Sequence, residues 1–493
     1  MAGNEVKTEI SKKLSENIQY LNERLAIGEK NFDIILKEIV IGGKKAALLF
    51  IDGFTSNDIS TLILQTILSV RREDIFPGIL DKLLHHLIPY VEVTPINDLE
   101  EAIRETLAGP MLLLVDGERQ GLLIDIRQYP ARSPQEPDIE RITRGSRDGF
   151  VETLVFNISL IRRRIRDPKL RVEAIKAGRR SVTDVAIMYI EDIAHPGIVE
   201  NVRSRIKNIQ VDALPMAEKS VEEFITAGSH WNPFPAVRYT ERPDVAATHL
   251  IEGHVVIIID TSPSVMIAPV TFFHHLQHAE ESRQNPISGT YVRWVRLIGI
   301  FISFVIIPLW MLLVLEPQYL PEPLAFIGPK EKELSIPLFV QFIIAHFGLD
   351  LVRMASIHTP SPFATALGLV GALLIGQIAV EVGFFLPEVL LYTGLVALGV
   401  FSTPSYELSM ANRVILLVMI VLTGVFRLPG FLGGIALILL RLFTTRSFGF
   451  PYMWPLYPFN LKALLSIFVR RPIPLEQARP SYLRTRDADR AKS

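Results

Sequence analysis

Two polar side chains, Gln377 and Glu381, interrupt the apolar run ATALGLVGALLIGQIAVEVGFF at residues 364–385. As a helix this run is long enough to cross a hydrocarbon core of ~30 Å. A charged side chain at the centre of a spanning helix costs roughly 2.5–3.5 kcal/mol, so Glu381 should face protein or water. A spacing of four residues places the two polar side chains on one helix face. Leu373 and Val370 continue that face, and an acid beside an apolar constriction is the chemistry of an ion pathway.

Three interpretations of Glu381 stay open at this point. It lines a pore together with the rest of its face, it makes a structural contact inside a helix bundle, or it lies near a helix end and reaches the membrane interface. A second face of the same run holds Gly368, Ala372 and Gly376. Side chains this small let a neighbouring helix approach closely, so we expect this face to pack against another helix.

Catalytic and metal-binding patterns are scarce in the sequence. His274 and His278 are four residues apart, a spacing that can hold a metal on a helix, but no HExxH pattern accompanies them. We therefore expect an ordinary surface pair and no metal site. Phosphate-binding glycine motifs and a GxSxG nucleophile motif are absent, and the chain has no cysteine. These observations predict a protein that is not an enzyme and carries no cofactor.

The densest basic stretch is IRRRIRDPKLRVEAIKAGRR, Ile161–Arg180. It could contact lipid headgroups or an acidic partner. A solvated face paired with nearby acids such as Asp148 and Glu152 is the interpretation that we favour. The whole chain has 51 basic and 52 acidic residues, a net charge of −1, which gives no argument for binding nucleic acid.

Composition predicts an α+β region of two similar mixed α/β subdomains, followed by a polytopic α-helical membrane domain. In the second subdomain DVAATHLIEG and HVVIIID repeat a helix, glycine and apolar hairpin of the first, so that Gly253 matches Gly109 at an offset of 253 − 109 = 144. A charged N-terminus without an apolar core argues against a secretory signal and predicts a cytoplasmic location for both subdomains. The expected parts are a polar leader 1–30, subdomain 1 at 31–130, a linker 131–150, subdomain 2 at 151–290, the membrane domain 291–460 and a basic cytoplasmic tail 461–493.

The membrane domain is expected to begin with the span Leu297–Leu315, which follows Arg293 and Arg296 and so starts on the cytoplasmic side. Ile336–Phe347 is short for a crossing, and Asp350 and Arg353 after it could form an intramembrane pair. The further apolar segments are 364–385, 389–401, 414–426 and, after the break RLPG, 431–443. The tail has eight basic and three acidic residues. Both ends should therefore lie inside, which requires an even number of crossings, four or six.

Several long motifs together resemble the A subunits of the GerA type of spore germination receptor. They are TRGSRDGFVETLVFNISLIRRRIRDPKL and GRRSVTDVAIMYIEDIA in the first half, and GLVGALLIGQIAVEVG, TPSYELSMANR and RSFGFPYMWPLYPF in the membrane half. The resemblance covers about residues 30–460, and it is specific because the motifs occur in the same order.

The resemblance implies a multi-pass protein of the inner membrane of endospores with both termini cytoplasmic. It also implies a homo-oligomeric, pentameric ion channel that conducts cations during germination. The expected partners are a small membrane protein, other germination proteins and the lipid bilayer, with no nucleic acid. One sporulation-protein branch of the family is expected to amplify the signal of the nutrient receptors. Two alternatives stay open: a proton-coupled transporter that uses Asp350 and Glu381, and a non-conducting scaffold of the germination complex.

Overall fold

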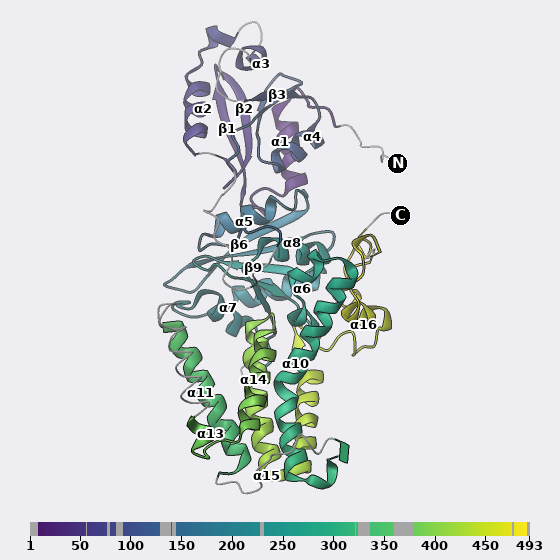
Figure 1. The fold of residues 1–493 in the computed structure, drawn as a ribbon. Coiled ribbons are helices and arrows are strands. Elements are labelled where there is room, and N and C mark those ends of the chain that lie inside the picture. Colours follow the sequence, from purple (N-terminus) through teal and green to yellow (C-terminus); the bar gives the residue numbers. More distant parts are fainter. Residues whose placement is uncertain are drawn as a thin grey trace. The chain divides into compact units, whose positions relative to one another are not determined.

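The computed structural model describes residues 8–55, 57–75, 79–84, 92–128, 140, 144–226, 231–320, 322–323, 336–358, 378–475 and 478–490. Contacts divide the chain into two compact units. Unit 1 consists of residues 1–230, 237–269 and 473–493, and unit 2 of residues 231–236 and 270–472. Figure 1 shows the sheets of unit 1 and the long helices of unit 2.

The first sheet of unit 1 has five strands in the order β1-β2-β4-β5-β3, and every neighbouring pair is antiparallel. Gly42 and Gly43, with φ of +54° and +86°, make the tight turn between the first two strands. The strands are β1 (Ile34–Ile41), β2 (Lys44–Ile51), β3 (Val93–Ile96), β4 (Met111–Val115) and β5 (Gly121–Ile124).

Helices cover both faces of this sheet. Ala46 and Leu48 of β2 face one core, while Ala47 and Leu49 face the other, as strand periodicity requires. The first core is closed by α2 and α3 and the second by α1 and α4. The helices are α1 (Leu14–Leu25), α2 (Asn57–Ser69), the 3₁₀ turn η1 (Arg72–Ile75), α3 (Ile79–Lys82) and α4 (Leu99–Leu107).

Helix α1 corrects the expectation of a polar leader. Its residues Leu14, Leu21 and Leu25 are buried in the second of these cores. Most other positions of α1 hold polar or charged residues, so its apolar stripe is hard to recognise in the sequence. Residues 14–25 therefore belong to the first subdomain.

The second sheet repeats the strand order of the first as β6-β7-β9-β10-β8, again with antiparallel pairs only. Helices α5 and α8 contact each other on this sheet, and α6 contacts α7 (Figure 1). The shared order supports the predicted duplication. The strands are β6 (Leu170–Ala177), β7 (Thr183–Ile190), β8 (Arg238–Thr240), β9 (Val255–Ile259) and β10 (Val265–Ala268), and the helices are α5 (Leu154–Arg162), α6 (Pro196–Lys207), α7 (Ala217–Ile225) and α8 (Pro243–Glu252).

A buried ion pair joins the two subdomains inside unit 1. The Arg162 guanidinium donates to Asp33 Oδ1 over 2.8 Å and to Asn31 Oδ1 over 3.0 Å. The side chains of Arg162 and Asp33 are 1% and 0% exposed. Asn31 Oδ1 also accepts from the Val172 amide of β6 over 2.9 Å. This cluster fixes the start of the first sheet against α5 and β6.

The expectation of a solvated basic face is only partly right. Arg164 does pair with Asp148, as expected, over 2.5 Å. Arg171 is 5% exposed and pairs with Glu191 over 2.6 Å, so it lies in the interior together with Arg162. Guanidinium side chains are tolerated inside a protein when they have acidic partners, as Arg162 has in Asp33 and Arg171 has in Glu191.

Residues 478–490, which lie in the predicted basic tail, belong to unit 1. Tyr482 and Leu483 are buried, and the Arg486 amide donates to the Ile193 carbonyl over 3.0 Å. The segment contains the 3₁₀ turn η8 (Ser481–Leu483), and η7 (Ile473–Leu475) precedes it. Residues 482–486 are therefore held against the second subdomain.

Unit 2 is a bundle of apolar helices. In the described residues three helices are long and apolar enough to cross a membrane: Pro286–Leu315, Leu338–Ala355 and Tyr406–Thr444. The expected short segment 336–347 is wrong, because α11 continues through Asp350 and Arg353 for 21 residues. The helices are α9 (Ala279–Arg283), α10 (Pro286–Leu315), α11 (Leu338–His358), α13 (Ala379–Glu381), α14 (Pro387–Phe401), α15 (Tyr406–Thr444) and α16 (Leu461–Phe468), with 3₁₀ turns η3 (Phe272–Leu276) and η4 (Pro317–Tyr319).

Helix α15 is a helical hairpin broken at the predicted RLPG segment. Arg427 has φ of 55° and ψ of −133°, which no helix permits. Gly430 lies against the Leu422 carbonyl, and Gly434 lies against Met419. Contacts at these spacings mean that the two arms of α15 run antiparallel.

The segments before and after the bundle meet at one end of it. The Val270 amide donates to Ser447 Oγ over 3.0 Å, and the Phe272 amide donates to the Tyr452 carbonyl over 2.8 Å. Ser447 belongs to the short ribbon of β11 (Arg446–Ser447) and β12 (Phe450–Pro451) that follows α15. The chain therefore enters and leaves the bundle at the same end. The even number of crossings stays a prediction.

Candidate functional site

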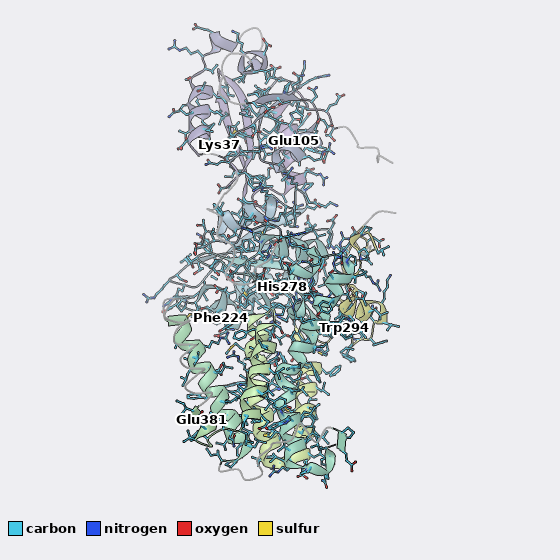
Figure 2. All side chains as sticks on the ribbon, in the orientation of Figure 1. Lys37, Glu105, Phe224, His278, Trp294 and Glu381 are labelled. Atoms are coloured by element: carbon cyan, nitrogen blue, oxygen red, sulfur yellow. The ribbon has the colours of Figure 1, made fainter. Side chains whose placement is uncertain are left out.

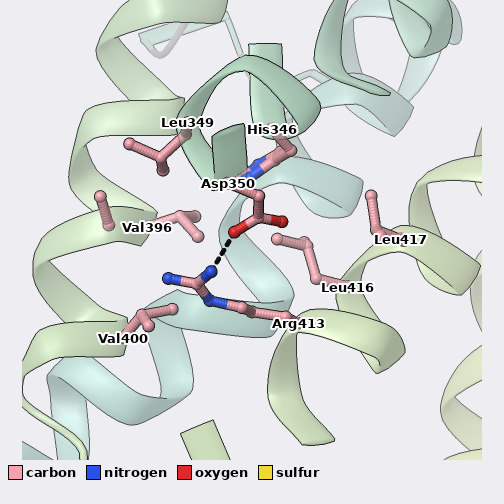
Figure 3. A pocket seen from close by; sticks show the side chains of 9 residues that line it. His346, Leu349, Asp350, Val396, Val400, Arg413, Leu416 and Leu417 are labelled. Carbon is pink, nitrogen blue, oxygen red and sulfur yellow. Dashed lines mark hydrogen bonds and ion pairs between the residues drawn. The ribbon is translucent and has the colours of Figure 1, made fainter. Parts of the chain in front are cut away.

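A charged cluster lies between the apolar helices α11, α14 and α15 (Figure 3). Arg413 of α15 forms an ion pair with Asp350 of α11. His346 lies one turn before Asp350 on α11, so both side chains point to the same side. The rest of the lining is apolar and comes from all three helices: Leu349, Val396, Ala397, Val400, Leu416 and Leu417.

The cluster is an ion pair packed among apolar groups, not a ligand cleft. The cavity beside it has a volume of about 10 Å³, at the lower limit for one water molecule. The Arg413 side chain is 12% exposed and the Asp350 side chain 39%. Charges attract strongly in such low-dielectric surroundings, and either group alone would be costly. The arrangement therefore ties α11 to α15 and leaves part of the Asp350 carboxylate at the bundle surface.

Arg413 is the partner that the sequence prediction missed. It lies 63 residues from Asp350 along the chain, and its position directly before the apolar segment 414–426 was the available signal, because a charge so close to apolar helix needs a partner. The predicted pair of Asp350 with Arg353 stays a prediction. In the structure the Arg353 guanidinium carbon lies 5.2 Å from the centre of the Tyr406 ring, a cation–π contact.

Glu381, the acid of the predicted pore face, is the last residue of α13 (Figure 2). The chain turns after it at Gly383, with φ of +74°, so the expected helix through residue 385 is wrong beyond Glu381. Glu381 is exposed, and so are the apolar side chains of Ile378 and Val382 beside it, at 49% and 74%. The carboxylate thus lies on an apolar surface near the end of a helix.

The other members of the two predicted faces lie outside the described residues, so their roles stay predictions. They are Val370, Leu373 and Gln377 of the pore face, and Gly368, Ala372 and Gly376 of the packing face.

Close packing through small residues does occur elsewhere in the bundle. Gly399 of α14 faces the backbone carbonyl of Gly299 in α10, and its α-carbon leaves no room there for a side chain. Ser303, one turn further along α10, is fully buried beside it. These residues let the backbones of α10 and α14 approach closely.

Comparison with known proteins identifies the family. The sequence matches the family described as Bacillus/Clostridium GerA spore germination protein over residues 19–482 of 493. The chain belongs to the GerA family. The resemblance expected from the motifs is therefore confirmed, and it extends beyond the range that the motifs covered.

Two GerA relatives from Bacillus subtilis (strain 168) match along nearly their whole length. This chain is 45% identical to Stage V sporulation protein AF, over 97% of this chain and 97% of that protein. It is 30% identical to Spore germination protein KA, over 97% of this chain and 88% of that protein. The crystal structure of the N-terminal domain of the A subunit of the Bacillus megaterium spore germinant receptor GerK3 aligns with a TM-score of 0.43 at 26% identity, covering 54% of this chain and 99% of that domain.

In this GerA protein the two histidines predicted to form a surface pair do not share a helix. His274 lies in the 3₁₀ turn η3 and is 5% exposed. His278 instead caps α9, accepting a hydrogen bond from the Glu280 amide over 3.2 Å. The sequence prediction failed here because the i, i+4 spacing has meaning only inside a continuous α-helix.

The two arginines at the start of the first GerA span share one acid. Arg293 Nε donates to Glu281 Oε2 over 2.7 Å, and Arg296 pairs with the other carboxylate oxygen. The Glu281 side chain is 1% exposed, so this triad is part of the interior of unit 2. It anchors the beginning of α10 to α9.

Proposed function

We propose that the chain is a subunit of an oligomeric, pentameric ion channel in the inner membrane of the endospore, with both termini cytoplasmic. The channel conducts cations during germination and amplifies the signal of the nutrient receptors. The proposal assigns the protein no catalytic step and no cofactor. Its membership of a spore germination family supports the setting, and the ionisable groups on the helix bundle support the conduction.

The observation that carries the proposal is the position of Asp350. It lies within a membrane-length apolar helix, yet 39% of its side chain is exposed at the surface of the bundle. Contact of a carboxylate with lipid tails is costly, so this surface should meet water or another protein surface in the working assembly. A ring of subunits around an aqueous path provides such surroundings for every copy.

Glu381 supports the same assembly from another part of the bundle. Its carboxylate is exposed among exposed apolar side chains, including Phe384 at 48%. In a ring of subunits the Glu381 carboxylates would form an acidic mouth that concentrates cations. Val370, Leu373 and Gln377 would line the narrower path, with the apolar pair acting as a dewetting gate.

Planar-bilayer recording from the purified full-length chain tests the proposal, with the subunits counted by native mass spectrometry. We expect ohmic single-channel steps selective for cations, and a lower cation-to-anion permeability ratio in Glu381→Gln. Glu316→Gln is the matched control, because it removes an acid from the end of α10 and should leave the ratio unchanged. A monomeric protein without conductance would overturn the proposal, and an unchanged ratio in Glu381→Gln would overturn the acidic mouth.

The gate has its own test in living cells. Leu373→Ala shortens the predicted apolar constriction, so vegetative cells expressing it should leak potassium and lose membrane potential. Leu440→Ala makes the same chemical change at a side chain of α15 that is 61% exposed, and it should not leak. Normal potassium retention in Leu373→Ala at normal protein levels would contradict the assigned pore face.

The cluster of His346, Asp350 and Arg413 favours one second candidate, a proton-coupled transporter. Carboxylates and histidines that lie together within membrane helices are typical of proton relays. Flux through a transporter saturates with substrate and depends on pH, and Asp350→Asn should abolish the pH dependence. Ohmic conductance that persists in Asp350→Asn would instead favour the channel.

A further inference from the structure

We propose that unit 1 binds a divalent transition-metal ion of the Zn²⁺ class through His249, Glu252 and His254. The ligand atoms of these three side chains lie within 4.8 Å of one another. They converge where α8 ends and β9 begins, in the segment HLIEGH. The site is independent of the proposed ion path, since it uses no residue of the membrane helices.

The turn after α8 brings the three side chains together. Gly253 has φ of +101°, a conformation that glycine adopts without steric cost. Its amide donates to the Leu250 carbonyl over 3.0 Å, and the His254 amide donates to the His249 carbonyl over 3.0 Å. These bonds close the helix end and fold His254 back beside His249. The two imidazole ring centres are 5.0 Å apart as a result.

Hydrogen bonds to backbone carbonyls fix the tautomer of both histidines. His249 Nδ1 lies 2.8 Å from the Val245 carbonyl oxygen, and His254 Nδ1 lies 2.7 Å from the Pro269 carbonyl oxygen. A carbonyl oxygen can only accept, so each Nδ1 carries the proton and each Nε2 presents a lone pair. This is the arrangement that orients histidines in metal sites, with the second nitrogen bound to an outer carbonyl.

His249 and His254 are 6% and 0% exposed, so both imidazoles lie inside the fold of unit 1. A metal ion binds imidazole through a lone pair of the neutral ring, which Nε2 supplies in the tautomer fixed by these hydrogen bonds.

Glu252 completes a donor set of two nitrogens and one carboxylate. Its Oε2 lies 3.8 Å from His254 Nε2, and its side chain is 19% exposed, which gives an ion access from solvent. Imidazole donors favour zinc and its neighbours over magnesium or calcium, which prefer oxygen ligands alone. Three protein ligands leave one position of a four-coordinate ion open. The Tyr482 hydroxyl lies 3.4 Å from His254 Nε2 and is the neighbouring side chain that could occupy this position.

Two arginines oppose the binding of a cation here, and both have acidic partners. Arg238 pairs with Glu140 over 3.1 Å, so its charge is balanced outside the site. Arg490, near the end of the chain, pairs with Glu252 over 2.5 Å. A metal ion at Glu252 must compete with Arg490. Metal binding is therefore coupled to the ion pair between Arg490 and Glu252.

Zinc titration of the full-length chain in detergent, after chelator treatment, tests the site. We expect one saturable zinc per chain, and at least a ~100-fold loss of affinity in His249→Gln and in His254→Gln, since even outer-shell changes cost 10–100-fold. Co²⁺ should give the intense visible absorption of a four-coordinate ion, and excess Mg²⁺ should not compete. His195→Gln is the control, because His195 caps α6 outside the cluster.

Two further measurements keep the test decisive if a core histidine variant fails to fold. Glu252→Gln changes the least buried of the three ligands, and it should weaken zinc binding while the protein stays folded. Zinc should also speed hydrogen exchange at residues 486–490 of the unchanged chain, because Arg490 is displaced. Zinc bound with equal affinity by the His249, Glu252 and His254 variants, or no saturable binding by the unchanged chain, would overturn the proposal.

Discussion

Replacing Gly399 by alanine should destabilise the helix bundle, although alanine is the better helix former. A β-carbon on Gly399 would be driven into the backbone oxygen of Gly299 on α10, and it would also lie 3.2 Å from Ser303 Cβ. A carbonyl oxygen in a helix cannot rotate away as a side chain can. The two helices must therefore separate where they now approach most closely.

The size of the effect follows from three contributions, of which two destabilise the bundle and one stabilises it. Overpacking of a well-packed contact costs about 1–3 kcal/mol. A separation on the order of 1 Å also forfeits a quarter to a half of the dispersion energy along the contact. Replacement of a helical glycine by alanine returns roughly 0.5–1 kcal/mol. We expect a net destabilisation of about 1–2 kcal/mol, which lowers the melting temperature of a domain this size by about 2–8 °C.

Two other glycines supply matched controls for a thermal-unfolding assay of the full-length chain in detergent. Gly394 lies on α14 like Gly399, but a β-carbon there meets nothing within 4 Å, so Gly394→Ala should raise the melting temperature slightly. A β-carbon on Gly299 would lie 2.5 Å from Ser402 Oγ, which can rotate. That rotation gives up the hydrogen bond from Ser402 Oγ to the Gly399 carbonyl, worth about 1 kcal/mol, so Gly299→Ala should be close to neutral.

The order of the melting temperatures of the three variants tests the close contact between α10 and α14. Gly399→Ala should be the least stable, Gly299→Ala intermediate and Gly394→Ala the most stable. A melting temperature of Gly399→Ala equal to or above that of the unchanged chain would refute the close backbone contact between α10 and α14. Equal losses in all three variants would point to a general effect of glycine replacement instead.

Three further predictions concern charged groups. Arg162→Met leaves Asp33 buried without its cation and should lower the free energy of unfolding by about 3–5 kcal/mol. The loss should be seen as faster hydrogen exchange in β6. Adding Asp33→Leu should recover most of it. Arg413→Leu should lower the melting temperature in detergent through a loss of about 2–3 kcal/mol in stability. The double variant with Asp350→Leu should be more stable than Arg413→Leu alone. A double variant no more stable than Arg413→Leu would contradict the ion pair of Asp350 with Arg413. Burial lowers the pKa of His254 to about 3, so below pH 6.5 the unfolded chain takes up a proton that the folded chain does not. In chelator-treated protein His254 should contribute about 1.4 kcal/mol per pH unit to the loss of stability of unit 1 against urea as the pH falls from 6.5 to 4.5. His254→Gln should make the dependence shallower by that amount, and the contribution of His249, whose pKa is also lowered by burial, should remain.

Short stretches of sequence determine the local elements of this protein. The helix and glycine of DVAATHLIEG, the apolar strand of HVVIIID and the break at RLPG are all where the sequence predicts them. Each depends on interactions between residues a few positions apart, such as a glycine conformation, a cap or the periodicity of apolar side chains. The same reasoning recovered the repeated subdomain, because a duplicated chain repeats its local signals.

Predictions about which residues share a site were less successful. The sequence did not single out Arg413, which reaches the Asp350 carboxylate from another helix. It assigned Arg162 to a solvated face, although a buried acid 129 residues away accepts its hydrogen bonds. Charge and spacing cannot reveal partners that only chain folding brings together.

The sequence by itself determined that this chain has two repeated α/β subdomains, a set of apolar helices and membership of the GerA family, since composition, periodicity and long motifs are properties of the chain. The tertiary structure decided that Asp350 pairs with Arg413, that α1 and residues 478–490 are parts of unit 1, and that His249, Glu252 and His254 converge. The physical reason is that an ion pair or a metal site needs atoms within a few ångströms, and that distance is set by packing between elements.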